Sequence, residues 1–134
     1  IEFALFDLSI HKHNPALNAA QVQATLDDIR QKYAVAPTAS YNRFQHSFSH
    51  IFAGGYAAGY YSYKWAEVLA SDAFDRFEKE GVFNTQTGKE FRQFILAVGG
   101  KDTALDAFIN FRGREPKIDA LLRHQGWTNA SKNT

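Results

Sequence analysis

Residues 50–68 read His-Ile-Phe-Ala-Gly-Gly-Tyr-Ala-Ala-Gly-Tyr-Tyr-Ser-Tyr-Lys-Trp-Ala-Glu-Val, and this stretch combines three glycines with four tyrosines. Each glycine in a helix costs about 1 kcal/mol relative to alanine, so stability alone does not explain this composition. Tyr56, Tyr60 and Tyr63 are spaced so that a helix from about Tyr56 to Lys79 would bring them onto one face. The stretch therefore predicts a row of phenol hydroxyls that can donate hydrogen bonds to an oxygen-rich ligand.

The glycines of this stretch decide between two interpretations of its aromatic residues. Taken one by one, Tyr60, Tyr61 and Trp65 fit an aromatic stripe packed into a core. A core helix does not need Gly54, Gly55 and Gly59 beside such residues, whereas a backbone that approaches a ligand closely does. For the stretch as a whole, we therefore favour a binding site.

Hydrophobic periodicity along the rest of the chain predicts an all-α fold of about five to six helices. No stretch alternates with period two for long, and residues 84–88 have the composition of a loop. Asn18 is a predicted N-cap, Gly81 and Gly113 are predicted stops, and residues 38–55 contain a helical turn or two. The expected helices are residues 2–13, a segment from Asn18 to before Pro37, about 56–79, 89–98, a short helix capped by Asp102 or Thr103, and 116–124.

Length and composition restrict the class of protein. The 134 residues correspond to one segment of ordinary domain size, and we expect a disordered tail at residues 129–134. A net charge of +1 with scattered basic residues does not indicate a nucleic-acid partner or a membrane surface. No apolar run approaches the ~20 residues that span a bilayer. The chain has no cysteine, which fits a reducing compartment such as the cytoplasm, and its start at Ile1 leads us to expect a segment of a longer protein.

Other candidate chemistry is weaker than the tyrosine row. His46 and His50 are four apart and could hold a metal ion from one helical face, but the zinc-protease motif needs Glu where Ser47 stands, and no third ligand follows. Ser47 and Ser49 lack the glycines of a nucleophile elbow. We therefore predict no metal site within this chain and no serine nucleophile.

The patch Phe111-Arg-Gly-Arg-Glu-Pro116 is the second unusual feature. Arg112 and Arg114 flank a glycine and could bind a carboxylate of a ligand. The favoured alternative is a salt-bridged corner with Glu115 or another acid.

Together, residues 50–68, residues 77–84, Gly88, Gly99-Gly100 and residues 111–116 resemble the C-terminal end of the thimet oligopeptidase family. The resemblance covers residues 1 to about 127, and the run of Gly-Gly-Tyr followed by Tyr-Tyr-x-Tyr-x-Trp-x-Glu-Val is specific. It implies a zinc endopeptidase that cuts short peptides in a channel between helical lobes. The zinc of that family is held by a His-Glu-x-x-His helix and a downstream Glu, which this chain lacks, so the resemblance places the zinc ligands upstream of Ile1.

The same resemblance assigns roles to residues of this chain. It implies that His50 and Tyr63 are catalytic residues that stabilise the tetrahedral intermediate, because an oxyanion develops when water attacks a peptide carbonyl. It implies that Tyr56 and Tyr60 contact the substrate backbone, while Gly54 and Gly55 let the segment close on a bound peptide.

We carry two main hypotheses from the sequence. The first is the C-terminal segment of a cytoplasmic zinc oligopeptidase, inactive alone, whose partners are short peptides and the upstream remainder of its catalytic domain. It also predicts that exposed apolar surface lets the isolated segment self-associate. The second is a stand-alone helical module that binds a peptide or a partner helix without metal.

Overall fold

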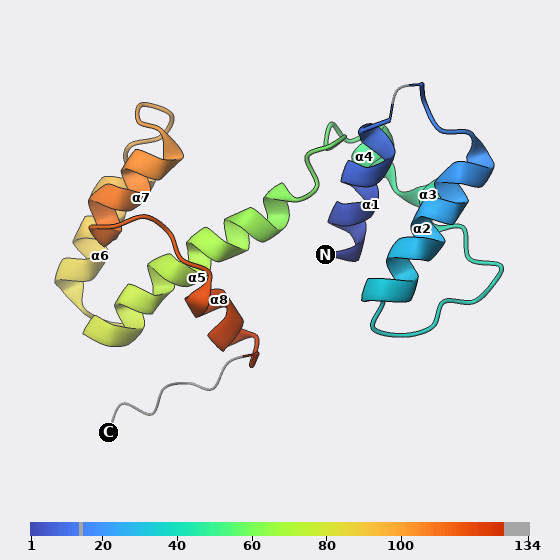
Figure 1. Ribbon diagram of the computed structural model, residues 1–134. Helices are drawn as coiled ribbons and strands as arrows, with labels where there is room; N and C mark the ends of the chain where they lie inside the picture. Colours follow the sequence, from blue (N-terminus) through green and yellow to red (C-terminus); the bar gives the residue numbers. More distant parts are fainter. Residues whose placement is uncertain (14, 128–134) are drawn as a thin grey trace. The chain divides into compact units, whose positions relative to one another are not determined.

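A computed structural model describes residues 1–13 and 15–127. The chain divides into two compact units, Ile1–Lys64 and a second unit that begins at Trp65. Within the described residues all regular structure is helical, which confirms the predicted all-α class (Figure 1). The same residues form eight α-helices, of which five have seven residues or more. The predicted tail at 129–134 lies outside the described residues.

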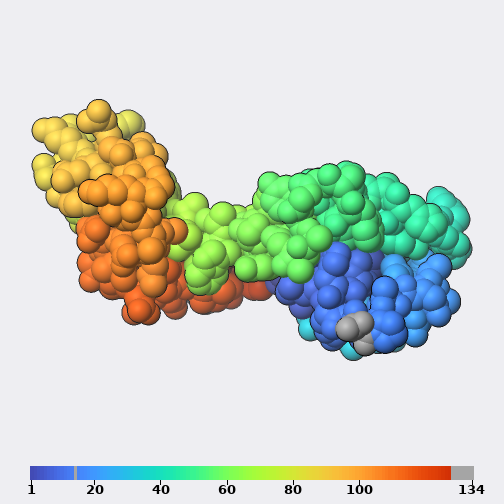
Figure 2. Space-filling view, turned by 90° about the horizontal axis from the view of Figure 1, so that it is seen from above, coloured from blue at the N-terminus to red at the C-terminus, as the bar shows by residue number. Residues whose placement is uncertain are grey.

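The first unit contains two long helices and two short ones. The bounds are α1 (Glu2–His11), α2 (Ala19–Tyr33), α3 (Phe44–Ser47) and α4 (Ser49–Phe52). Asn18 caps α2 as predicted: its side chain accepts a hydrogen bond from the Gln21 N–H, and the Gln21 side chain accepts one from the Asn18 N–H. Figure 2 shows the blue N-terminal segment lying against the green segment that follows α4.

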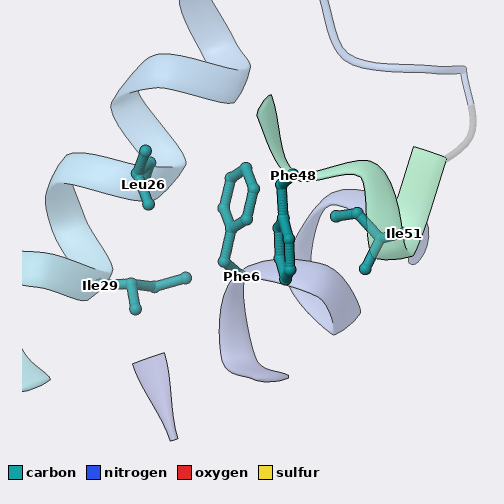
Figure 3. Close-up of a cluster of buried hydrophobic side chains, with 5 residues drawn as sticks. All are labelled: Phe6, Leu26, Ile29, Phe48 and Ile51. Atoms are coloured by element: carbon teal, nitrogen blue, oxygen red, sulfur yellow. The ribbon is translucent and has the colours of Figure 1, made fainter. Parts of the chain in front are cut away.

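The core of the first unit joins these helices. Five buried side chains from α1, α2, α4 and the α3–α4 junction pack together, as Figure 3 shows, and they are Phe6, Leu26, Ile29, Phe48 and Ile51. Phe6 and Leu26 have no exposed surface. The rings of Phe6 and Phe48 stack with centroids 6.4 Å apart, so α1 and the start of α4 are held by aromatic packing.

The long helix of the tyrosine stretch begins later than predicted. α5 spans Ser62–Glu80, whereas residues 57–61 form turns. The prediction of a helix from Tyr56 is therefore wrong for its first six positions. Gly55 and Ala58 both have positive φ, at 78° and 54°, and a right-handed helix does not accept that conformation.

The second unit consists of the rest of α5, α6 (Thr85–Phe91), a π-helical turn η1 (Arg92–Leu96), α7 (Ala104–Arg112) and α8 (Asp119–His124). Thr103 caps α7 and Gly113 ends it at φ 71°, both as predicted. The prediction of a loop at 84–88 is wrong, because the Asn84 side chain accepts hydrogen bonds from the N–H groups of Gln86 and Thr87 and starts α6 there.

The C-terminal helix also starts later than predicted. α8 begins at Asp119 rather than at Pro116. The N–H of Lys117 donates to the Asp72 carboxylate at 2.7 Å, which holds the chain in a non-helical course before α8. Among the described residues, no helix is both long and apolar enough to cross a membrane.

Two buried aspartates of α5 organise the second unit. Asp72 accepts a bidentate hydrogen bond from Arg114 at 2.6 and 2.7 Å and lies 3.0 Å from Arg112. Asp75 pairs with Arg112 at 2.9 Å and with Arg123 at 3.1 Å. The predicted salt-bridged corner is thus confirmed, and its acids come from α5 rather than from Glu115.

These ion pairs make the stability of the second unit depend on pH. Burial opposes ionisation of Asp72, but hydrogen bonds from Arg114 and the Lys117 N–H outweigh it and hold the pKa below its usual value. Burial also opposes ionisation of Asp75, and Lys79 and Arg123 likewise hold its pKa low. A carboxyl whose pKa is lowered by folding stabilises the fold above its unfolded pKa and loses that contribution as pH falls through the folded pKa.

We therefore expect the melting temperature of this chain to fall steeply as pH drops below about 4, the ordinary pKa of an aspartate. Circular dichroism melts between pH 7 and pH 2 measure this loss. A melting temperature that stays constant from pH 5 to pH 2 would show that the two aspartates do not stabilise the folded chain.

Candidate functional site

Four predicted site residues come together in the first unit. We call His50, Tyr56, Tyr60 and Tyr63 the tyrosine cluster. The Tyr63 ring stacks on Tyr56 with centroids 5.2 Å apart and lies 5.0 Å from Tyr60. The His50 ring stands edge-on to Tyr60 at 5.7 Å and to Tyr63 at 6.3 Å. The three tyrosines were predicted to share one face of a helix; they do lie together, but a turn rather than a helix face brings them there.

The cluster packs on the rings of Phe3 and Phe48, which we call the aromatic floor and which join it to the core. The Tyr60 ring packs against Phe48 at 5.0 Å and against Phe3 at 6.2 Å. Phe48 is buried and the His50 ring lies 6.0 Å from it, so Tyr60 and His50 both join the cluster to the core. The interpretation as core residues is wrong for Tyr61 and Trp65, which are 52% and 57% exposed.

Tyr63 and Tyr56 present their side chains to solvent, with 42% and 38% of their surface exposed. Hydrogen bonding with the Tyr56 side chain, and secondarily partial burial, raises the pKa of the Tyr63 hydroxyl above its usual value. A hydrogen bond raises a pKa when the protonated group donates it, so this shift indicates that the Tyr63 hydroxyl is engaged with Tyr56. To act on a ligand, the hydroxyl would have to exchange this partner for an oxygen of the ligand.

Gly54 and Gly55 lie between α4 and Tyr56, and each position requires glycine for a different structural reason. A Cβ added at Gly54 would lie 3.0 Å from both the Cα and the carbonyl oxygen of His50. Gly54 thus lets the chain fold back tightly over His50. Gly55 has φ 78°, the left-handed conformation that glycine adopts most easily. The observed close approach of Gly54 is to His50, which belongs to the cluster.

Asp7 is the residue of this site that sequence reasoning missed. It lies in α1, has no exposed surface, and accepts hydrogen bonds from the N–H groups of Ala58 and Tyr60 at 2.8 and 2.9 Å. The sequence offers one signal for it, a carboxylate between Phe6 and Leu8 on a largely apolar helix with His11 one turn later. A buried carboxylate needs partners, and these backbone groups supply them.

No metal site forms from the part of the chain that the structure describes. Among residues 1–13 and 15–127, no group of three or more His, Cys, Asp or Glu side chains could hold a metal ion. His46 and His50 do not share a continuous helix, because Phe48 separates α3 from α4 with ψ 64°. These residues therefore do not fit the zinc that the family resemblance implies.

Comparison with known proteins matches this chain to one family of peptidases and to relatives of that kind. The sequence model of the family described as Peptidase family M3 matches residues 1–127. The chain is 54% identical over 126 residues to Oligopeptidase A of Escherichia coli, which covers 94% of this chain and 18% of that protein. It is 47% identical over 135 residues to the Probable cytosolic oligopeptidase A of Arabidopsis thaliana, covering 98% of this chain and 19% of the relative. It is 35% identical over 128 residues to the Dipeptidyl carboxypeptidase of Escherichia coli, covering 92% and 18%. The chain thus spans less than a fifth of the length of these relatives.

Proposed function

This chain belongs to peptidase family M3, and from that membership we propose that it is the C-terminal segment of a zinc-dependent oligopeptidase that hydrolyses short peptides. The matched relatives are far longer than the chain. The proposed activity is therefore that of the whole protein, and the isolated chain does not hydrolyse peptides.

The observation that carries this proposal is the geometry of the tyrosine cluster. Attack of water on a peptide carbonyl produces an oxyanion, and preorganised donors aimed at that oxygen are the largest single source of stabilisation in many such sites. Tyr63 is partly exposed, and its ring lies against the rings of Tyr56, Tyr60 and His50. In our proposal, Tyr63 donates to the oxyanion and His50 assists it from the adjacent position.

The other members of the site bind the substrate in this proposal. Tyr56 is exposed beside Tyr63 and contacts the peptide backbone, and Tyr60 supports the same surface from the aromatic floor. Gly54 and Gly55 lie between α4 and Tyr56, where a change in backbone torsion would move Tyr56 toward a bound peptide.

The metal belongs to another part of the whole protein in this proposal. The described residues do not form a metal site, so we assign the zinc to residues outside this chain. The chain itself contributes hydrogen-bond donors and substrate contacts. We place the enzyme in the cytoplasm, which is supported by the lack of cysteine and by the cytosolic name of one relative.

The experiment that tests the proposal compares two purified proteins. The full-length protein that carries this chain should hydrolyse short peptides, lose activity on chelation and recover it with zinc. The isolated 134-residue chain should show no hydrolysis with or without zinc. Specific peptide binding by the isolated chain, together with an inactive full-length protein, would instead favour the stand-alone binding module.

The isolated chain should also self-associate. Exposed large apolar side chains in both units give it adhesive surface, and they include Val35, Tyr41, Phe83, Leu96 and Trp127. Sedimentation velocity across a concentration series tests this property, and a monomer at every concentration would contradict it.

Tyr56→Phe in the full-length enzyme should raise KM about 2- to 10-fold and change kcat less, because it removes one hydrogen bond to the substrate backbone. Tyr33→Phe is a suitable control, since Tyr33 is 52% exposed and lies at the end of α2, outside the cluster. Steady-state kinetics on one peptide measure both variants. An unchanged KM in Tyr56→Phe would remove Tyr56 from the binding surface.

A further inference from the structure

We propose that Asp7 is a positioning residue that fixes the tyrosine cluster in its working conformation by holding the backbone of residues 58–60 from α1. The inference rests on the proposed function for its kinetic consequence. Its structural part stands independently on the contacts of Asp7.

The contacts of Asp7 span the turn that carries the cluster. Its Oδ1 accepts from the N–H of Ala58 at 2.8 Å, and its Oδ2 accepts from the N–H of Tyr60 at 2.9 Å. These partners lie 51 and 53 residues away in the sequence. The carboxylate therefore bridges two backbone positions of the same turn, as the cap of a helix does.

The environment of Asp7 makes this bridge strong. The side chain is fully buried next to Phe6, and Oδ1 also lies 2.9 Å from the Nδ1 of His11. Hydrogen bonds to an ionised acceptor are shorter and roughly twice as strong as neutral ones. A buried carboxylate that lost these donors would be strongly disfavoured, so the turn and α1 are coupled.

The Asp7 bridge holds the backbone at Ala58 in a conformation that is unfavourable for alanine. Ala58 has φ 54°, and it is the one non-glycine residue with positive φ in the described part of the chain. An alanine in this conformation needs support from its surroundings. The Asp7 oxygen on the Ala58 N–H provides that support.

The effect of the bridge passes to Tyr63 through Tyr60. Asp7 fixes the Tyr60 backbone, while Phe48 and Phe3 fix its ring. The Tyr63 ring then lies 5.0 Å from the Tyr60 ring and stacks on Tyr56. Gly54 and Gly55 precede the two bridged residues in the chain, whereas Tyr63 follows them. In our proposal the bridge therefore keeps Tyr60 and Tyr63 in place, and any movement of the segment occurs at the two glycines.

The test uses Asp7→Asn in the full-length protein. Asparagine keeps the size of the side chain but replaces one acceptor oxygen by an NH₂ group, so it cannot accept from both backbone groups. We expect amide hydrogen exchange of Ala58 and Tyr60 to accelerate about tenfold or more. We expect kcat to fall about 10- to 100-fold with a smaller change in KM, since small misplacements of reacting groups cost that much.

The matched control is Asn84→Ala, at a side chain that also accepts hydrogen bonds from two backbone N–H groups but lies in the second unit. It should accelerate exchange near Gln86 and Thr87 and leave kcat unchanged. A second variant replaces Tyr60 by its α-hydroxy acid, which converts one N–H into an ester oxygen while keeping the carboxylate and all rings. Like Asp7→Asn, this variant should lower kcat. It replaces Asp7→Asn as the test of the bridge if Asp7→Asn fails to fold.

Each outcome decides the inference. Faster exchange at Ala58 and Tyr60 together with lowered kcat supports it. Unchanged exchange at these amides in folded Asp7→Asn overturns the bridge, and faster exchange with unchanged kcat overturns the positioning role. If the full-length wild-type protein has no peptidase activity, the proposed function and the kinetic role fail together, while exchange still tests the bridge.

Discussion

Replacing Tyr63 with phenylalanine in the full-length enzyme is expected to lower kcat about 10²–10³-fold and to change KM little. The substitution removes one hydroxyl and keeps the ring that stacks on Tyr56 and packs on Tyr60. If this hydroxyl exchanges its bond with Tyr56 for one to the oxyanion as that charge develops, its loss affects the transition state more than the bound substrate. Steady-state kinetics on one short peptide give both constants.

Tyr61→Phe is the matched control for this prediction. Tyr61 belongs to the same turn and is 52% exposed, but its ring is not part of the tyrosine cluster. Its kcat should stay within a factor of two or so of the wild type, as expected for a surface substitution. A kcat for Tyr63→Phe that equals that of Tyr61→Phe would exclude the hydroxyl of Tyr63 from catalysis.

Asp72→Ala is expected to lower the free energy of unfolding of the second unit by about 3–5 kcal/mol. The Asp72 and Arg112 side chains are 1% and 7% exposed, so removing the carboxylate leaves a buried guanidinium with less compensation. Arg114 and the Lys117 N–H lose an acceptor in the same step. Urea unfolding of the 134-residue chain, followed by circular dichroism, measures the loss.

Lys79→Ala provides the comparison. Lys79 pairs with Asp75 at 2.7 Å, but its side chain is 67% exposed. A pair of this kind contributes about 0–1 kcal/mol. Equal losses in the two variants would show that burial does not determine the strength of these ion pairs.

Local signals in the sequence predicted the helices well where local contacts decide them. Asn18 and Thr103 cap helices because their side chains bond to N–H groups three residues later. Gly113 ends a helix because it adopts positive φ. In each case the decisive partners lie within one turn of the residue, so the pattern is visible in the sequence.

The wrong helix starts at Tyr56 and Pro116 arose where a distant residue controls the backbone, whereas the wrong loop at 84–88 overlooked a local cap by Asn84. The spacing of Tyr56, Tyr60 and Tyr63 suggested one helix face, but Asp7 in α1 binds the turn at 58–60 and α5 starts only at Ser62. Arg112 and Arg114 were expected to find an acid, and nothing near them indicated that Asp72 and Asp75 in α5 would supply it. Nothing local links residues so far apart in the chain.

The sequence nevertheless indicated which residues make up the candidate site. His50, Tyr56, Tyr60 and Tyr63 form one cluster, and Gly54 and Gly55 are each required by the backbone around it. The sequence pointed to these residue types in one short stretch. The sequence could not reveal that Phe3 and Phe48 together form the aromatic floor, because Phe3 lies far from this stretch in the sequence.

The most direct measurement of the central claim is the inhibition constant of a phosphinic peptide, a stable mimic of the tetrahedral intermediate, for full-length wild type and Tyr63→Phe. If Tyr63 stabilises that intermediate, the inhibition constant rises by about the same factor by which kcat/KM falls, on the order of 10²–10³. An inhibition constant that stays the same while kcat/KM falls would contradict the claim, because Tyr63 would then act on a different step.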